Sequence, residues 1–237
     1  DRLNSGVRSL VSDSGFVKGV TLKNGETSGS DLVIDAEGCS SALLKQAGLR
    51  GLNSRMVARG IQAEVDHIND VDTDMVEVYF GTKVAPGFFA WIIPRKDGSA
   101  KVGLATRHGD PHVFLQNFMT KHPVASKKLG KSKTTYISAH PIPLDGPIPK
   151  TYTNGFLAVG DAASQVKATT GGGVVFGLTC AEVAGKVAVE AVNRHDFSEN
   201  FLSVYQSGWK KLVGFDLAAM LQMRKMLDSL SDRRIDR

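Results

Sequence analysis

Short segments of mixed apolar and polar residues, separated by turn residues, make up the first part of the chain, and apolar residues take helical spacing in the last part. Residues 7–11 and 17–22 form a hairpin-like pattern, and Asp13-Ser14-Gly15 between them is typical of a tight turn. These segments predict a β-hairpin. A short buried strand is predicted over residues 31–35, because Leu32-Val33-Ile34 is a continuous apolar run.

The middle of the chain is rich in strand patterns. A helix over residues 41–47, ended by Gly48, precedes them. A helix over 111–121 and a strand over 134–139 follow, and the Pro-Ile-Pro triplets at 141–143 and 147–149 predict a stiff extended connection. Four β-rich segments separated by turns predict an antiparallel sheet: 56–65, 75–80, 88–93 and 101–106.

The β-rich run over residues 156–159 predicts a short buried parallel strand that ends at Gly160-Asp161. Because α/β sheets bind ligands at the C-terminal ends of their strands, we expect the Asp161 carboxylate at a binding edge. Gly171-Gly172-Gly173 allows a close approach of the backbone, and a helix over 173–194 begins there with its free N–H groups. Further helices are predicted over 198–207 and 209–230.

Composition places the chain among soluble globular proteins, with 42% hydrophobic and 22% charged residues. Its net charge of +5 suits an anionic cofactor or an anionic membrane surface. No run of Lys and Arg interleaves with aromatic residues, which argues against nucleic acid. Cys39 and Cys180 are far apart in sequence and read as free thiols, Cys180 in the core, so we expect a cytoplasmic location.

The string Gly160-Asp161-Ala162-Ala163, continued to Gly171-Gly172-Gly173, resembles the geranylgeranyl reductase family. The string is most similar to the form of this motif in archaeal digeranylgeranylglycerophospholipid reductases. This family lies within the p-hydroxybenzoate-hydroxylase-like flavoproteins. The resemblance implies bound FAD, with Asp161 accepting hydrogen bonds from the ribitol hydroxyls. It also implies that four neighbours approach the cofactor through their backbone: Gly160, Gly172, Gly173 and Val174.

A second segment, Asp35-Ala36-Glu37-Gly38 followed by Cys39-Ser40-Ser41, resembles the family's strand-Ala-Asp-Gly-x-x-Ser element. The resemblance implies that Glu37 and Gly38 lie near the pyrophosphate and ribose of FAD. Glu37 stands where Asp is usual, and its extra methylene places the carboxylate differently. The alternative interpretation is an ordinary strand-to-helix turn.

Phe88-Phe89-Ala90-Trp91-Ile92-Ile93-Pro94 resembles the family's Tyr-x-Trp-x-Phe-Pro element, which is linked to the lipid substrate. Gly103-Leu104-Ala105 stands where Gly-x-Gly is usual. The implied substrate-binding residues are Phe89, Trp91, Pro94 and Gly103, although Phe89 lacks the hydroxyl of a tyrosine. Composition alone predicts a buried amphipathic strand here.

The expected fold class is α/β (α+β): an incomplete Rossmann-like FAD-binding domain with an antiparallel-sheet substrate domain and C-terminal helices. Residues 1–52 and 151–194 are assigned to the FAD-binding domain, 53–150 to the substrate domain and 195–237 to the C-terminal helical region. The chain lacks the Gly-x-Gly-x-x-Gly unit that binds a pyrophosphate. We therefore expect it to be the C-terminal two-thirds of a larger protein.

The implied reaction is FAD-dependent reduction of isoprenoid C=C bonds in geranylgeranyl lipids, a step of membrane phospholipid biosynthesis. The electron donor stays open among a ferredoxin, NAD(P)H and another carrier, and no catalytic proton donor is identified. Two alternatives are a related flavin monooxygenase or quinone oxidoreductase, and a non-catalytic lipid-binding remnant, since the Gly-x-Gly-x-x-Gly unit is absent.

No metal site is predicted. Gly109 and Pro111 break any helix that would pair His108 with His112, and Met75 stands where an Asp70-x-Asp72 calcium loop needs glycine. The last predicted helix has a broad apolar surface flanked by lysines. Packing onto the protein is the default expectation for this surface, and peripheral contact with a membrane is the alternative.

Overall fold

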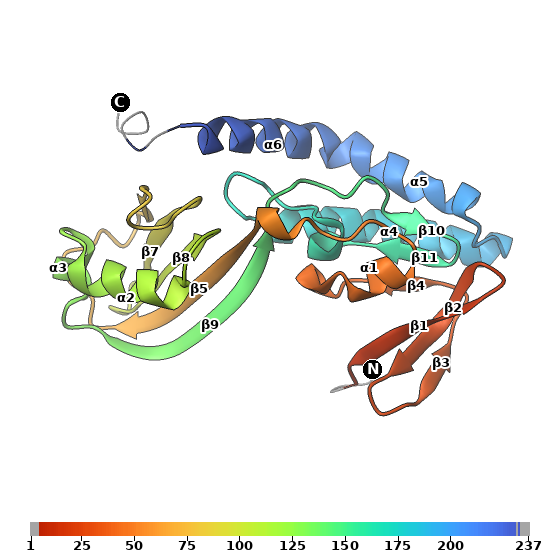
Figure 1. The fold of residues 1–237 in the computed structure, drawn as a ribbon, viewed down its shortest axis with the longest axis horizontal. Helices are drawn as coiled ribbons and strands as arrows, with labels where there is room; N and C mark the ends of the chain where they lie inside the picture. Colours follow the sequence, from red (N-terminus) through yellow and green to blue (C-terminus); the bar gives the residue numbers. More distant parts are fainter. Residues whose placement is uncertain (1–4, 231, 233–237) are drawn as a thin grey trace. The chain divides into compact units, whose positions relative to one another are not determined.

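The computed structural model describes residues 5–230 and residue 232, and the chain forms a mixed α/β structure with antiparallel sheets and C-terminal helices, as predicted (Figure 1). It divides into two compact units. Unit 1 comprises Asp1–Ser54 and Pro143–Lys225, and unit 2 comprises Arg55–Ile142 and Met226–Arg237. The finer division into domains made from the sequence stays a prediction.

The predicted hairpin is confirmed in unit 1. Strands β1 (Val7–Asp13) and β2 (Phe16–Leu22) pair antiparallel, and β3 (Thr27–Gly29) extends the sheet in the order β1-β2-β3. Ser14 and Gly15 form the turn with φ values of 49° and 80°. Such a turn matches the right-handed twist of the two strands, which explains why its sequence is informative.

A second sheet of unit 1 has the order β10 (Tyr152–Thr153), β11 (Phe156–Ala158), β4 (Val33–Asp35). β11 and β4 are parallel, with Ala158 opposite Asp35, and β11 is fully buried as predicted. The strand predicted over residues 31–35 forms over a shorter range, and the prediction that it is buried is wrong at its centre, because Ile34 is 46% exposed. Among the described strands β4 pairs only with β11, so its other edge is open.

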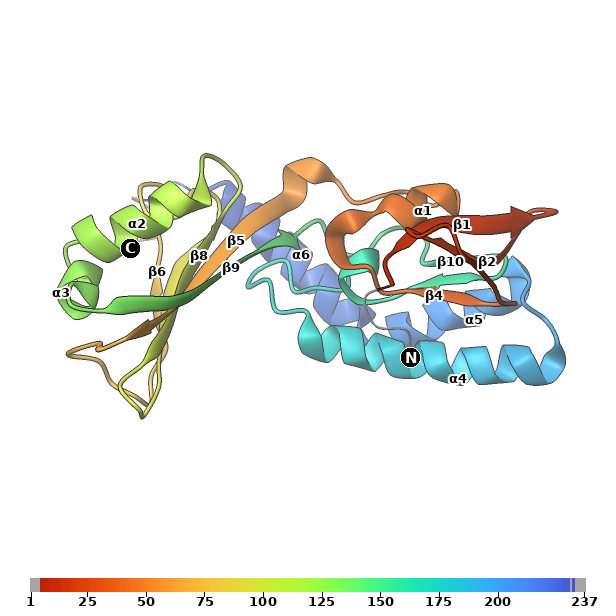
Figure 2. The same ribbon diagram turned by 90° about the horizontal axis from the view of Figure 1, so that it is seen from below.

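Two helices pack together in unit 1, α4 (Val174–Arg194) and α5 (Glu199–Trp209), and they lie side by side in Figure 2. Ser198 caps α5 through its hydroxyl, which accepts from the N–H of Phe201. The predicted core position of Cys180 is confirmed, with a fully buried side chain. The short helix α1 (Ala42–Gln46) ends before Gly48, as predicted.

The single helix predicted over residues 209–230 is interrupted. A π-helical turn, η4 (Lys210–Gly214), joins α5 to α6 (Phe215–Asp228). Trp209, Leu217 and Arg224 are buried, whereas Phe215 is 83% exposed. The default expectation that this region packs onto the protein therefore holds for one of its faces only.

Unit 2 is built on a five-stranded sheet in the order β6-β7-β8-β5-β9. The predicted antiparallel sheet is confirmed by the pairings of β5 with β8, β6 with β7 and β7 with β8. The strands run as follows: β5 Val57–Asp66, β6 Glu77–Tyr79, β7 Ala90–Pro94, β8 Ala100–Thr106 and β9 Lys133–Pro143.

The edge strand β9 is longer than predicted and includes residues 141–143, which the sequence assigned to a connection. That assignment is wrong, because prolines are tolerated in an edge strand. On its outer side, a missing N–H removes no hydrogen bond to a neighbouring strand. The short helices η2 (Ser54–Met56) and α3 (Ala125–Leu129) were not predicted. No helix within residues 5–230 has the length and apolarity needed to cross a membrane.

Helix α2 (Pro111–Lys121) has the predicted bounds. Asp110 caps it by accepting from the N–H of His112, and Pro111 occupies the first turn, where no N–H is needed. Leu115 and Phe118 of α2 pack on one face of the sheet. Ala90 and Ile92 belong to this core, so Trp91 points to the opposite face, away from α2.

Candidate functional site

The C-terminal ends of the two parallel strands β4 and β11 meet in unit 1. The N–H of Val159 donates to the carbonyl of Asp35 at 2.9 Å, which holds the two chain segments together where they leave the sheet. Two short 3-10 helices follow, η1 (Gly38–Ser40) after β4 and η3 (Gly160–Ala163) after β11. The fold therefore brings the predicted cofactor segments around Gly38 and Asp161 to one sheet edge.

Glycines keep this edge open. Gly38 has a φ of +72° and Gly160 a φ of +67°, a region that L side chains rarely adopt. A Cβ at either position would meet no heavy atom within 4 Å. The backbone is therefore accessible in front of both strand ends, which is the space that a nucleotide cofactor requires in α/β sheets.

The Asp161 carboxylate lies against the start of α4. An added Cβ at Gly173 would lie 2.8 Å from Asp161 Oδ1 and 3.0 Å from a methyl group of Val166. Gly173 is the N-cap of α4, and the first N–H groups of a helix have no partner within it. The arrangement therefore places a carboxylate beside unpaired donors, with Gly172 and Val174 exposed on either side.

Two carboxylates at this edge have raised pKa values. Burial raises the pKa of Asp161. Burial also raises the pKa of Asp35 to about 6, and the charge of Glu37 adds to the effect. Asp35 Oδ1 accepts from the N–H of Glu37 at 2.9 Å, but its buried Oδ2 has no partner among the described residues. An acceptor without a donor at a strand end fits a ligand that carries hydroxyls.

The carboxylate of Glu37 is turned toward the protein. Its Oε1 accepts from the N–H of Leu43 at 2.8 Å, in the first turn of α1. Glu37 thus stabilises α1, and its predicted role at the cofactor stays a prediction.

The side chain of Lys167 lies in the loop between Asp161 and the glycines. Its ammonium group is 5.3 Å from the centre of the Phe176 ring.

A buried network of hydrogen bonds holds the backbone of the Gly160 loop. Gln165 is fully buried, accepts from the N–H of Gly160 at 2.8 Å and donates to the Tyr205 hydroxyl at 3.1 Å. The Tyr205 hydroxyl donates in turn to the carbonyl of Ala158 at 2.9 Å. The sequence did not indicate this pair, because the two residues are forty positions apart and a buried glutamine has no local signature.

In unit 2, the predicted Trp91 and Gly103 face each other across β7 and β8. A Cβ on Gly103 would lie 2.5 Å from Trp91 Cζ2, so the indole ring covers the backbone of the glycine. The indole N–H donates to Gln62 Oε1 at 3.3 Å, and Gln62 is the partner of Gly103 on β5. Only glycine at position 103 allows the ring to lie this close to the sheet.

The face that carries Trp91 changes from aromatic to charged along the strands. Phe89 contacts Trp91 edge-on at 6.0 Å between ring centroids, and it also lies 5.8 Å from Phe80. Two residues beyond Trp91, Ile93 pairs with Lys101, and Lys101 pairs with Glu64 across the sheet. Two cations contact the Glu64 carboxylate on this side, Arg95 at 3.3 Å and Lys101 at 3.8 Å.

The predicted Pro94 is separated from this face. Pro94 is buried. Because successive side chains of a strand point to opposite faces of the sheet, Pro94 lies on the face of Ile92 and not on that of Trp91. A cavity of about 170 Å³ opens beside Trp91 and Gln62, with Ser138, His140 and Ile142 of β9 on its other wall. Phe89, Trp91 and Gly103 are thus grouped with Gln62, which the sequence did not indicate.

Comparisons with known proteins show which sequences this chain resembles. Residues 57–137 match the family model described as the geranylgeranyl reductase catalytic domain. The chain is 37% identical over 211 residues to digeranylgeranylglycerophospholipid reductase 2 of Methanothermobacter thermautotrophicus, covering 86% of this chain and 52% of the relative. It is 35% identical over 208 residues to the digeranylgeranylglycerophospholipid reductase of Methanocaldococcus jannaschii, covering 86% and 53%. The chain thus spans about half the length of these relatives.

Solved structures extend the likeness. A geranylgeranyl bacteriochlorophyll reductase-like protein from Thermoplasma acidophilum aligns with a TM-score of 0.88 at 25% identity, covering 98% of this chain and 60% of that chain. The flavin-dependent brominase Bmp2 aligns with a TM-score of 0.69 at 14% identity, covering 94% and 61%. The brominase shares the fold alone.

Proposed function

The chain belongs to the geranylgeranyl reductase family, and from this premise we propose that it is part of an FAD-dependent oxidoreductase that reduces isoprenoid C=C bonds of geranylgeranyl lipids. The observation that carries the proposal is the meeting of Gly38, Gly160, Asp161 and Gly173 at the ends of two parallel strands. The reaction would be a step of membrane lipid biosynthesis, as the names of the relatives suggest.

Unit 1 would hold the ribitol and flavin part of FAD. The Asp161 carboxylate would accept hydrogen bonds from ribitol hydroxyls, and the N–H groups at Gly172, Gly173 and Val174 would face the flavin ring. The open backbone at Gly38 and Gly160 and the unpaired Asp35 Oδ2 support this assignment. Bound in its reduced form, FAD supplies the hydride.

The chain's own residues would contribute position and electrostatics. With FAD bound as proposed, the first turn of α4 would direct its partial positive charge toward the flavin ring, where it would stabilise the anionic reduced form. Gln165, held by Tyr205, fixes the backbone of the loop at Gly160, next to Asp161. These are binding and orienting roles, and no residue is assigned as the proton donor.

Unit 2 would bind the isoprenoid lipid on the sheet face that carries Trp91. Phe80, Phe89 and Trp91 offer aromatic surface to a hydrocarbon chain, and Gly103 keeps the indole flat. Arg95 and Lys101 at the other end of the same face suit a polar or anionic end of the molecule. We also propose a cytoplasmic location with peripheral membrane contact, because the substrate is a membrane lipid.

The test uses the full-length protein and two readouts. Flavin fluorescence measures FAD retention, which Asp161→Ala should weaken. Mass spectrometry after chemical reduction under anaerobic conditions measures the gain of two hydrogens per reduced C=C bond of a geranylgeranyl phospholipid. Flavin binding without any mass gain, accompanied by oxygen consumption with an aromatic substrate, would contradict the proposed reaction.

A further inference from the structure

The most exposed large apolar side chain described in unit 1 is not at the cofactor edge. It is Phe215, 83% exposed at the start of α6. Leu212 in η4 is 60% exposed and Met223 in α6 is 55% exposed, while Val204 of α5 is 51% exposed. We call these four residues, Val204, Leu212, Phe215 and Met223, the outer stripe.

Helical spacing gives the outer stripe its continuity. Val204 precedes Leu212 by eight positions, and Phe215 precedes Met223 by eight positions, a separation that keeps each pair within one broad side of a helix. Phe215 and Met223 are turned by about 160° and 120° from the buried Leu217 about the axis of α6. The opposite side of the helical segment is buried, because Leu202, Trp209 and Leu217 belong to the core of unit 1. The helical segment therefore has two apolar sides, of which only one is covered by the described chain.

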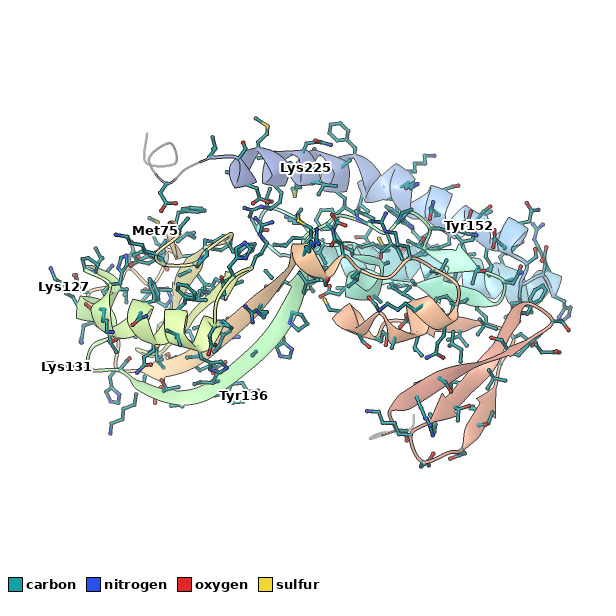
Figure 3. All side chains as sticks on the ribbon, in the orientation of Figure 1. Met75, Lys127, Lys131, Tyr136, Tyr152 and Lys225 are labelled. Carbon is teal, nitrogen blue, oxygen red and sulfur yellow. The ribbon has the colours of Figure 1, made fainter. Side chains whose placement is uncertain are left out.

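Charges beside the outer stripe favour an anionic partner. Between residues 203 and 225 the chain has four cationic residues, Lys210, Lys211, Arg224 and Lys225, and one carboxylate, Asp216. Arg224 is buried, so three lysines are available to the surroundings. Lys210 lies 5.9 Å from the centre of the Trp209 ring, and Lys225 is labelled on α6 in Figure 3.

An apolar stripe flanked by lysines favours a lipid surface over another protein as the partner. The core of a protein–protein interface is depleted in lysine, whereas lysines beside an apolar stripe lie well at a lipid surface, where their stems stay in the apolar layer and their ammonium groups reach phosphates. An amphipathic helix with large apolar residues on one side and flanking lysines is the usual element for binding in the plane of a membrane.

We propose that the outer stripe, with Lys211 and Lys225, docks this protein on the surface of an anionic lipid bilayer. Phe215 and Leu212 would enter the boundary between headgroups and hydrocarbon, and the lysines would contact lipid phosphates. This assigns a surface to the peripheral contact proposed above. It needs neither FAD nor catalysis, so its failure and the failure of the proposed reaction are distinguishable.

The experiment is co-sedimentation of the chain with phosphatidylcholine vesicles, prepared with and without phosphatidylglycerol. We expect binding to the vesicles that contain phosphatidylglycerol, weaker binding to neutral vesicles, and loss of binding at high salt. The double variant Leu212→Ser/Phe215→Ser should bind roughly tenfold or more weakly, because two large apolar side chains no longer enter the lipid. The double variant Lys211→Glu/Lys225→Glu should lose the preference for anionic vesicles.

A matched control keeps the result specific. Val189 and Val192 of α4 are 63% and 55% exposed, and they lie in the same unit. Val189→Ser/Val192→Ser should leave vesicle binding unchanged. The proposal is overturned if the wild-type chain does not sediment with anionic vesicles or if the control loses binding as strongly. It is also overturned if sedimentation velocity shows a dimer that only the Leu212→Ser/Phe215→Ser variant dissociates, because the stripe would then be an interface between two copies.

Discussion

The Asp161 carboxylate lies beside the backbone of Gly173, so closely that a methyl group on Gly173 would lie 2.8 Å from Asp161 Oδ1. The two residues lie twelve positions apart in sequence, yet they form one wall of the candidate cofactor site. Glycine is needed at 173 because of this neighbour. Its φ of −107° is one that any residue adopts.

Gly173→Ala should therefore weaken FAD binding by displacing the Asp161 carboxylate. The added methyl group also meets Val166 at 3.0 Å, which leaves little room for relaxation. The measurement is a titration with FAD followed by flavin fluorescence. Gly185→Ala is the control, since its Cβ meets nothing within 4 Å and a glycine-to-alanine change inside a helix stabilises by up to about 1 kcal/mol. Equal FAD affinity of both variants would contradict the role of Gly173.

Tyr205→Phe should destabilise unit 1 by about 1–3 kcal/mol, because the variant leaves Gln165 Nε2 and the carbonyl of Ala158 buried without their partner. Urea unfolding monitored by circular dichroism measures the change. Tyr152→Phe, at a half-buried tyrosine of the same unit, should change the stability by less than about 0.5 kcal/mol. A similar loss in the two variants would show that the network contributes nothing specific.

Asp35 should make unit 1 less stable as the pH rises. Its folded pKa of about 6 lies above the ordinary value of 3.8, so the folded state holds the proton more tightly than the unfolded state. The stabilisation is complete below pH 4 and is lost as the pH rises through about 6. By linkage it amounts to about 3 kcal/mol.

Asp35→Asn tests this pH dependence, since the amide keeps an acceptor for the N–H of Glu37 and carries no charge. The stability of the variant relative to the wild type should increase between pH 4 and pH 6 in urea unfolding without FAD. A difference that stays constant across this range would mean that Asp35 titrates normally.

Cys39 should react slowly with iodoacetamide. Burial raises the pKa of its thiol to about 11, and the nearby charge of Asp161 adds to the effect. Asp161→Asn removes the charge and should increase the rate of alkylation at pH 8 by about twofold or more, because more thiolate is present. Peptide mass spectrometry follows Cys39 separately from the buried Cys180. An unchanged rate would place Asp161 further from the thiol than the structure does.

Local signals in the sequence predicted local structure well. The bounds of α2 follow from Asp110 and Pro111, which specify a cap and a first turn, and the hairpin follows from Ser14 and Gly15. Long-range relationships were less accessible. The contact of Gln165 with Tyr205 depends on how α5 packs, and the exposure of Ile34 depends on which strand is beside β4. No residue near either position determines these outcomes.

The candidate site shows the same division. Asp161 and Gly173 were found because they lie in one motif, whereas Gln62 acts through Trp91 on another strand, and the importance of Asp35 depends on the burial of its Oδ2. Pro94 lies in the motif but points to the opposite side of the sheet, because alternation along β7 fixes its direction. A linear motif therefore identified the strand without identifying which of its residues share a face.

The π-helical turn η4 determines which residues of α6 are turned outward. In an unbroken α-helix, Asp216 and Met223 would follow Trp209 by seven and fourteen positions and share its inward side. Instead Leu217 and Arg224, each one position later, are buried, as expected when one residue is inserted into the helix. Deleting a single residue within 210–214 would rotate α6 by about 100° about its axis. One inserted residue thus sets the orientation of the whole helix and keeps a carboxylate out of the core.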